Sequence, residues 1–290
     1  MAFNRSFGTA AYTIRQKKSG GLLALPAVLW LVLFFLLPLA IVFFVSFMSR
    51  GPRGTIVFPL TLEHYNRIFD IFFPVIVDSV RIALVTTVIC LLVGYPLAFF
   101  ISTRKSRRAQ QIALFLVILP FWTNFLVRTY AWRVLLGGDG PVNNLLLSLG
   151  LIETPLTLLN TEFAVLVGLV YGFLPFMVLP IYASIERFDF RLVEAAYDLG
   201  ANDWHAFWRV VFPLTLPGVV AGCILVLIPS IGAFVTPDLL GGTEGLMIGN
   251  LIQTQFRGTG NWPLGSALSV VMMAMVSLGL IVYMRFGGQN

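Results

Sequence analysis

Few residues in this chain could carry out covalent chemistry. The only histidines, His64 and His205, fall in separate polar segments rather than beside a serine that would need a base. The only cysteines, Cys90 and Cys223, fall inside apolar stretches, where a thiol is small apolar filler and implies neither a disulfide framework nor a metal site. No Walker A glycine–lysine sequence occurs. The sequence therefore predicts a non-catalytic protein, and an intramembrane serine protease is strongly disfavoured.

The elements that would position any binding group are membrane helices. Of the 290 residues, 58% are hydrophobic and only 11% are charged, against roughly 45–50% apolar and about 25% charged in soluble domains. A helix needs about 20 apolar residues to cross the hydrocarbon core, and the alternation of a membrane barrel is absent. The first stretch is too long for a signal peptide and is expected to be retained. We expect six transmembrane helices: Gly21–Met48, Val75–Ser102, Gln110–Leu136, Phe163–Ile185, Val211–Val235 and Pro263–Met284.

Arginine and lysine residues collect on one side of these stretches. With the N-terminus inside, twelve lie in the inner segments and four in the outer ones, which is the bias that sets orientation. Both termini are therefore expected in the cytoplasm. The net charge of +6 reports this topology, and no contiguous basic face predicts nucleic acid binding.

This topology divides the chain into a few parts. The outer segments 49–74, 137–162 and 236–262 are rich in Gly, Pro and Asn and are expected to be loops, with a short helix at Thr61–Phe69. Several spans contain proline, Pro120 among them, which tends to kink or break a helix. The expected parts are a cytoplasmic segment 1–20, a first helix 21–48, an extracytoplasmic loop 49–74, a five-helix core 75–284 with a cytoplasmic loop at 186–213, and a cytoplasmic tail 285–290.

The cytoplasmic loop has the pattern of two short helices. Asp189 is a candidate N-cap for the first helix, and Gly200 permits a left-handed stop at its end. Asn202 or Asp203 can cap the second helix. Four apolar residues recur at helical spacing and would form one face of the first helix: Leu192, Ala195, Ala196 and Leu199. Such a helix-turn-helix either seats its apolar face in lipid or contacts another protein.

The same loop carries a motif. Glu194–Ala196, Gly200 after three residues, Val210 after nine more and then Phe212–Pro213 resemble the EAA motif of the permeases of ATP-binding cassette (ABC) importers. Isoleucine and leucine are usual in that family where this chain has Val210 and Phe212, so the departures are apolar for apolar. The resemblance implies an all-α membrane protein with six transmembrane helices, in the type I importer permease architecture with a cytoplasmic coupling helix.

The resemblance also implies how transport would be powered. The coupling helix would lie in a groove of a cytoplasmic ATPase subunit, and closure of the ATPase would move the spans. Glu194 would anchor the loop by charge or capping, the two alanines of the motif would allow close packing, and Gly200 would set the turn. ATP and Mg²⁺ would be bound by the ATPase, and this chain would hold no cofactor. The residues implied in ATPase coupling are Glu194, Ala195, Ala196, Asp198, Gly200 and Pro213.

An assembly follows from the same resemblance. Six spans are too few to surround an import pathway, so the family pattern implies a second homologous permease subunit. It further implies two copies of the ABC ATPase and an extracytoplasmic solute-binding protein. The complex would lie in the lipid of a bacterial cytoplasmic (inner) membrane.

Further segments are similar to the spermidine/putrescine permeases within this family. The similarity extends from the first span to Tyr283, and it favours a polyamine as the solute over an amino acid derivative such as GABA, an opine or a phosphonate. A self-sufficient secondary transporter is compatible with the composition but does not explain the EAA pattern. The segments that carry the resemblance are Ile118–Asn124, Leu174–Pro180, Gly218–Cys223 and Asp238–Gly242.

A pathway for a polyamine, which is a polycation, should offer carboxylates and aromatic faces. Asp78 and Arg81 lie one turn apart, a spacing that favours mutual neutralisation. Glu162 begins the fourth span and is expected to be a capping or snorkelling charge. Asp238, at the outer end of the fifth span, is the better candidate for contact with the solute.

The third span is the most polar one. Asn124 is placed near its middle with Arg128 one turn further on the same face, and polar groups in a span usually face a bundle interior or a cavity. An inter-helix hydrogen bond and a snorkelling arginine are the simpler interpretations. Because Arg128 would repel a polyamine, we expect it to orient a carboxylate or to dock the binding protein. The candidates for the solute pathway are Trp122, Asn124, Tyr130, Tyr171 and Asp238.

Overall fold

The computed structural model describes residues 25–287 of the chain. The predicted cytoplasmic segment 1–20, the first residues of the predicted first span and the tail residues 288–290 lie outside the described residues. Within that range five helical runs are long and apolar enough to cross a membrane: Leu25–Val45, Glu63–Ser102, Glu162–Glu186, Asp203–Ile231 and Trp262–Arg285. A sixth crossing exists only if the bent pair Arg107–Trp122 and Phe125–Leu135 counts as one span.

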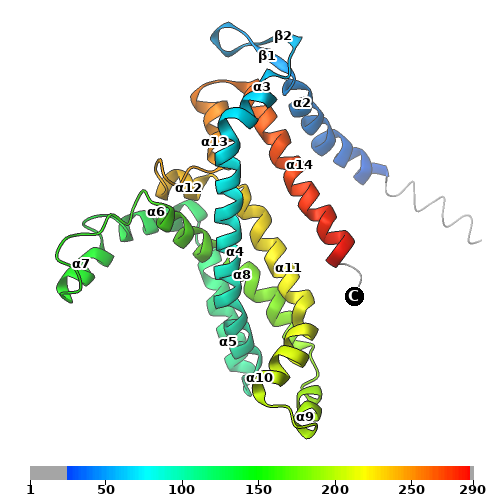
Figure 1. Cartoon of the computed structure of the whole chain (residues 1–290), viewed down its shortest axis with the longest axis vertical. Coiled ribbons are helices and arrows are strands. Elements are labelled where there is room, and N and C mark those ends of the chain that lie inside the picture. The colour runs from blue at the N-terminus through cyan, green and yellow to red at the C-terminus, as the bar shows by residue number, and fades with distance from the viewer. Residues whose placement is uncertain (1–24, 288–290) are drawn as a thin grey trace, which may run out of the picture.

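Three helices form the centre of the bundle. They are α4 (Phe73–Ser102), α8 (Glu162–Glu186) and α11 (Phe212–Ile231), and each packs against the other two (Figure 1). Buried apolar side chains from all three meet in one cluster, which includes Cys90, Met177, Ile181 and Val226. The two cysteines contribute as apolar filler here, as predicted.

Glycine residues bring α11 unusually close to α8. A Cβ atom at Gly218 would lie 2.6 Å from the Pro180 carbonyl oxygen and 2.5 Å from the Ser184 Cβ atom. One turn later, a Cβ atom at Gly222 would lie 2.8 Å from the Met177 sulfur. Small residues on one face let helix backbones approach closely in a membrane, so this pair of glycines sets the spacing between the two helices.

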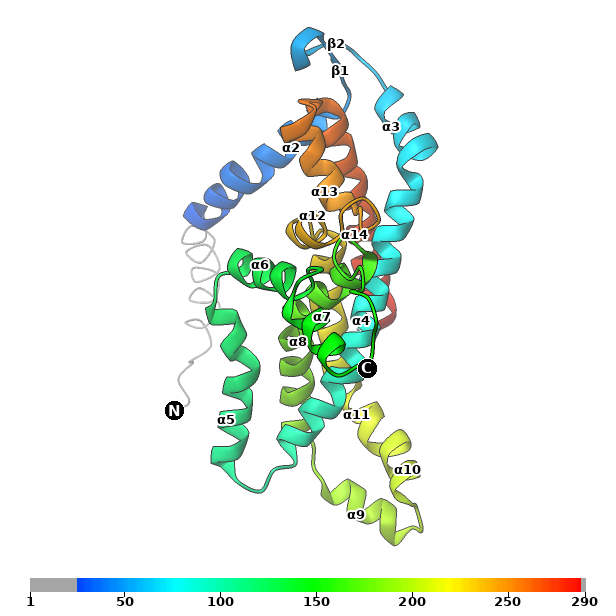
Figure 2. The same ribbon diagram turned by 90° about the vertical axis from the view of Figure 1, so that its left-hand side faces the viewer.

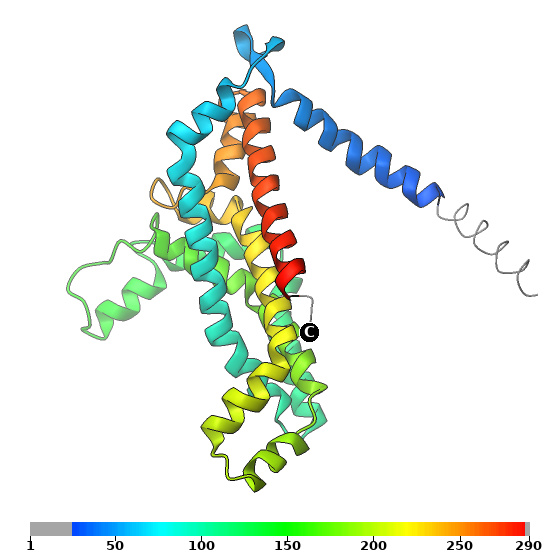
Figure 3. The same cartoon turned by 45° about the vertical axis from the view of Figure 1, so that its right-hand side comes forward.

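The N-terminal helix leaves the bundle. A π-helical turn (Val32–Leu36) leads into α2 (Leu37–Val45), whose only extensive neighbour among the described elements is α14 (Trp262–Gly287). Figure 3 shows this helix extending away from the remaining helices. None of its residues from Val32 to Val45 is buried by this chain, so its apolar surface is available to lipid or to another subunit.

The outer segment 49–74, predicted to be a loop, contains a hairpin and the start of a long helix. Strands β1 (Met48–Arg50) and β2 (Ile56–Leu60) pair antiparallel around a 3₁₀ turn (Pro52–Gly54). Helix α3 (Glu63–Arg67) does form within the predicted Thr61–Phe69, but it continues through a π-helical turn (Ile68–Phe72) into α4. The second span therefore begins at Glu63 instead of Val75, and the π-helical turn lies just before Pro74, whose missing N–H does not fit a regular helical ladder.

The remaining outer segments also contain short helices. The fifth span ends at Ile231, earlier than predicted, so Asp238 lies in a separate helix. Helix α13 (Ile248–Gln253) is tied to α4 by the Ile248 N–H, which donates to the Ser79 Oγ atom at 2.8 Å. The short outer elements are α7 (Pro141–Ser148), α12 (Val235–Leu240), α13 (Ile248–Gln253) and a π-helical turn (Thr254–Gly258).

The third span is broken, which contradicts the prediction of one helix over Gln110–Leu136. Helix α5 (Arg107–Ile118) continues as a 3₁₀ turn (Leu119–Trp122), and α6 (Phe125–Leu135) then departs at 91° (Figure 2). At the opposite end of the molecule from the hairpin lie α9 (Arg191–Asp198), α10 (Asp203–Ala206) and a π-helical turn (Phe207–Val211) that leads into α11.

Candidate functional site

The loop between α8 and α11 folds as the predicted helix-turn-helix. The N-cap position of α9 is Phe190 and not the predicted Asp189, but the Asp189 Oδ1 atom accepts the Arg191 N–H at 3.0 Å, one residue before that position. Gly200 has φ +84°, in the left-handed region, and its N–H donates to the Tyr197 carbonyl at 2.8 Å. The next N–H, of Ala201, donates to the Ala196 carbonyl at 3.0 Å. These two bonds form a Schellman motif, which ends the helix and reverses the chain.

The second arm of the loop is continuous with the fifth span. The Asn202 Oδ1 atom accepts the His205 N–H at 2.9 Å, so Asn202 rather than Asp203 is the cap of α10. Pro213 lies in the first turn of α11. Because α10 and the π-helical turn run into α11 without a break, a displacement of this arm is passed directly to a helix of the bundle centre.

Most of the apolar face predicted for α9 is left uncovered by this chain, although Ala196 is half-buried and Leu192 borders a cavity at the base of the loop. Leu199 is 90% exposed, and Leu192 and Ala195 are exposed as well. Packing within the chain uses the neighbouring stripe, in which Val193 and Tyr197 border a cavity of about 380 Å³ shared with α10. A hydrogen bond to the Asp203 carboxylate raises the pKa of the Tyr197 phenol and links the two arms. The exposed apolar side chains of α9 are therefore available to contact another protein or lipid.

Aromatic side chains extend that exposed surface onto α10. Trp204 is 67% exposed and packs edge-on against Trp208, with 5.6 Å between ring centres. Glu194 lies in the first turn of α9 and Asp198 in its last turn, and both side chains are exposed. An exposed patch of large apolar residues with a charged border is typical of an interaction site.

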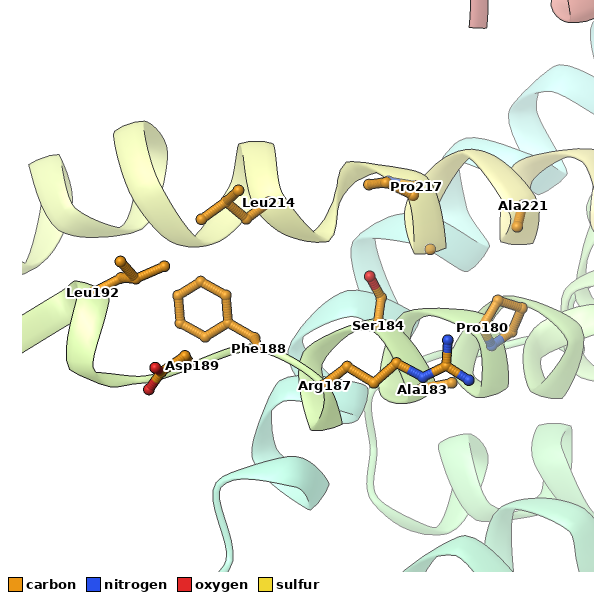
Figure 4. Close-up of a pocket in the computed structure, with 11 residues that line it drawn as sticks. Pro180, Ala183, Ser184, Arg187, Phe188, Asp189, Leu192, Leu214, Pro217 and Ala221 are labelled. Atoms are coloured by element: carbon orange, nitrogen blue, oxygen red, sulfur yellow. The ribbon is translucent and has the colours of Figure 1, made fainter. Parts of the chain in front are cut away.

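A cavity separates the base of the loop from the bundle. It measures about 490 Å³ and lies between the end of α8 and the start of α11 (Figure 4). Ser184 points across it toward Pro217, and the Ser184 Oγ atom donates weakly to the Thr215 carbonyl at 3.5 Å. Arg187, Phe188 and Asp189 form the wall where α8 passes into the loop. The loop thus joins the bundle through two chain segments with free space between them.

The break in the third span is held by side chains. The Pro120 carbonyl oxygen accepts the Thr123 Oγ1–H at 2.6 Å and an Arg128 Nη1–H at 2.9 Å. Asn124, predicted near the middle of a continuous helix, is instead the N-cap of α6, and its Oδ1 atom accepts the Leu126 N–H at 2.8 Å. Backbone that leaves a helix within a membrane needs such partners.

Replacing Asn124 with alanine should destabilise the bend. Loss of an N-cap costs about 1 kcal/mol, so the melting temperature of the purified protein should fall, whereas Asn124→Ser should restore it. Both values can be read from thermal unfolding in detergent. If Asn124→Ser failed to restore the melting temperature, the cap would not be what stabilises the bend.

Arg128 forms no salt bridge with a carboxylate among residues 25–287, and its other expected role, docking of the binding protein, stays a prediction. Besides its bond to the Pro120 carbonyl, its guanidinium lies 5.0 Å from the ring centre of Phe121, 5.5 Å from that of Phe125 and 5.7 Å from that of Tyr171. Trp132 packs edge-on against Tyr171 at 5.4 Å. Tyr171 is therefore brought to the bend by α8, next to the segment that holds Asn124.

The other pathway candidates are not brought together. Trp122 is 75% exposed at the bend and packs edge-on against Phe115. Tyr130 lies with the exposed Val127 and Val134 on the outward face of α6. Asp238 is exposed on α12, which packs against α6 and α8. Trp122 and Asn124 thus flank the break in the chain, and Tyr171 lies beside the break through its contact with Arg128, whereas Tyr130 faces outward on α6 and Asp238 lies on α12.

A charged network lies at the outer end of α4, and only one of its two ion pairs was predicted. Arg81 pairs with Asp78 at 3.3 Å, as its helical spacing indicates, and also with Glu162 at 2.6 Å. Thr161 caps α8 through its Oγ1 atom, so Glu162 is neither a cap nor a snorkelling charge but a link between α8 and α4. No signal in the sequence joins positions 81 and 162.

The bundle of crossing helices, with an exposed helix-turn-helix at one end and a broken span, defines a multi-span membrane protein of the transport class. Residues 91–288 match the family described as "Binding-protein-dependent transport system inner membrane component". The chain belongs to this family, as the EAA motif predicted.

Curated relatives cover most of the chain. The Haemophilus influenzae protein named "Spermidine/putrescine transport system permease protein PotB" is 46% identical over 88% of this chain and 90% of its own length. The Escherichia coli protein of the same name is 44% identical over 88% and 93%. The E. coli "Inner membrane ABC transporter permease protein YdcU" is 32% identical over 79% and 76%.

Solved structures agree on the fold. A bacterial ABC transporter involved in the import of alginate superposes with a TM-score of 0.68 at 18% identity, covering 96% of this chain and 99% of that one. The MetNI methionine ABC transporter gives 0.55 at 17%, covering 73% and 92%. The fold is that of type I ABC importer permeases, as predicted.

Proposed function

We propose that this chain is the permease subunit that forms half of the translocation pathway for a polyamine, with spermidine and putrescine as its solutes. The observation that carries this proposal is the 46% and 44% identity, over 88% of the chain, to two permeases named for those solutes. The alternatives are other small solutes such as an amino acid derivative.

The partners in this proposal follow from the free surfaces of the chain. The exposed face of α9 and the aromatic side chains of α10 would contact a cytoplasmic ATPase, present in two copies, which would bind ATP and Mg²⁺. The uncovered N-terminal helix fits a second homologous permease subunit or lipid. An extracytoplasmic solute-binding protein would deliver the polyamine at the end that carries the hairpin. Both termini would then lie in the cytoplasm.

The solute pathway in this proposal passes the bend of the third span. Trp122 and Tyr171 would offer aromatic faces, and Asn124 an amide, at the point where the span breaks. Asp238 on α12 would offer a carboxylate nearer the hairpin end, while Tyr130 fits contact with the second permease subunit better because its face of α6 is otherwise apolar.

The function is tested by uptake into liposomes. The chain, its companion permease, the ATPase and the binding protein should together accumulate labelled spermidine only when ATP is present. Unlabelled putrescine should compete, and GABA should not. If GABA or a phosphonate competed and putrescine did not, the proposal that the solute is a polyamine would be wrong. If this chain hydrolysed ATP by itself, the proposal that a separate subunit is the ATPase would be wrong.

A further inference from the structure

Arg128 is a cation in the broken third span. Among residues 25–287 the salt bridges involve Arg81 and Arg107, and Arg128 takes part in none of them. A charge in this environment is costly unless something replaces its hydration. The groups that do so here are three aromatic rings and one backbone carbonyl.

These groups form a cage assembled from two parts of the chain. Phe121 and Phe125 flank the break in the third span, and Tyr171 comes from α8. The negative faces of aromatic rings attract any cation that comes within about 6 Å of the ring centre. The Pro120 carbonyl adds one hydrogen-bond acceptor. Nothing in this set is specific for a guanidinium, so the cage can accept an ammonium group equally well.

An apolar cavity continues from the cage. Pro120 and Tyr171 also line a space of about 350 Å³, and Leu97, Leu116 and Leu174 are among its other walls. A ligand suited to both parts would carry a positive group at its end and methylene groups behind it. An alkylammonium has this composition, and a polyamine is a chain of such units.

The bend can tolerate departure of the arginine. When Arg128 leaves, the Pro120 carbonyl oxygen still accepts the Thr123 Oγ1–H at 2.6 Å, and Asn124 still caps α6. Because no carboxylate binds the guanidinium, exchange of one cation for another breaks only ring contacts and a single hydrogen bond. The site therefore holds a replaceable cation.

We propose that the cage of Phe121, Phe125, Tyr171 and the Pro120 carbonyl is an exchangeable cation site. The guanidinium of Arg128 fills it in this conformation, and an ammonium group of the solute replaces that guanidinium during passage, with the methylene chain in the adjoining cavity. The inference rests on the proposed polyamine function and assigns a place where the solute binds.

The first experiment removes the internal competitor. Arg128→Gln deletes the charge but keeps an N–H donor for the Pro120 carbonyl. In the assembled transporter, with the binding protein left out, labelled spermidine should bind about tenfold more tightly than to the wild type. Arg128→Lys, which keeps a cation, should stay near the wild type. The matched control is Arg133→Gln on the same helix, because Arg133 donates only to the Leu239 carbonyl, at 3.4 Å, and is not in the cage.

A second experiment uses the unaltered chain, so it does not depend on whether the variant folds. Arginine modification by phenylglyoxal is followed at Arg128 by mass spectrometry, with Arg133 as the internal reference. Spermidine should raise the modification of Arg128 relative to Arg133, and an uncharged polyol of similar length should not. Unchanged modification, or unchanged spermidine binding by a folded Arg128→Gln protein, would overturn the exchange and leave Arg128 as a clamp for the bend.

Different results would contradict the proposed polyamine transport and the proposed cation site. If the wild-type transporter with its binding protein does not import spermidine at all, the proposed function is wrong and the cage loses its ligand. If it imports spermidine but either experiment gives no response, the function stands and only the cation site is withdrawn.

Discussion

Replacing Gly200 with valine should abolish solute uptake while the ATPase subunits continue to hydrolyse ATP. Gly200 has φ +84°, and an L-residue in the left-handed region costs about 1–2 kcal/mol, with β-branched residues among the worst. No heavy atom lies within 4 Å of the position of its Cβ atom, so the cost comes from the backbone alone. To relieve it, the end of α9 must unwind, which displaces the exposed Leu199 and the motif residues on the same helix.

Asparagine at the same position provides the matched control. Asparagine tolerates the left-handed region and occurs naturally at helix ends of this kind, and the open space around the position accommodates its side chain. Gly200→Asn should therefore keep most of the uptake. The measurement is the ratio of spermidine imported to ATP hydrolysed in liposomes, with binding of spermidine by the binding protein unchanged. If the ratio of spermidine imported to ATP hydrolysed were the same in both variants and the wild type, the turn at Gly200 would have no role in coupling.

Replacing Gly218 with a larger residue should strongly destabilise the helix bundle. A Cβ atom there meets the Pro180 carbonyl oxygen at 2.6 Å and the Ser184 Cβ atom at 2.5 Å, and a backbone oxygen within a helix cannot rotate away. Overpacking of this kind costs about 1–3 kcal/mol. We expect Gly218→Ala to lower the melting temperature clearly, and Gly218→Leu to prevent accumulation of the protein in the membrane.

Gly172 is the control for this prediction. It lies in α8 and is buried, yet no heavy atom lies within 4 Å of where its Cβ atom would be. Alanine is favoured over glycine in a helix by about 1 kcal/mol, so Gly172→Ala should leave the melting temperature unchanged or raise it. A similar loss of stability in both variants would show that the close contact between α8 and α11 is not what limits the fold.

Features governed by local chemistry were predictable from the sequence. Hydropathy located five spans, because a run of apolar residues in lipid can only be helical. Gly200 and Asn202 identified the turn of the cytoplasmic loop, because a left-handed stop and a helix cap each depend on one residue and its immediate neighbours. The motif around Glu194 identified the family for the same reason, since its spacing is set by one helix and one turn.

Features that depend on distant residues or on a local break were not predictable in the same way. Hydropathy averages over a whole span and does not register a change of direction, so the bend at Asn124 was missed although Pro120 and Asn124 together are a signal for it. Tyr171 next to Arg128 and Arg81 next to Glu162 come from other helices, and only the packing of the bundle brings them within reach. The hairpin at β1 and β2 was missed because its strands are short and lie in a segment rich in turn residues.

The helical run from Glu63 to Ser102, which includes the π-helical turn at Ile68–Phe72, is long enough to serve as a lever. Its 40 residues reach about 60 Å at about 1.5 Å per residue, roughly twice the thickness of the hydrocarbon core. The inner half is clamped by α8 and α11, while the outer end follows the hairpin and contacts α14. A small tilt imposed at the inner clamp would therefore be amplified at the far tip, in proportion to arm length. A rotation near the cytoplasmic loop would become a displacement of the surface at the opposite end, where a soluble protein could rest.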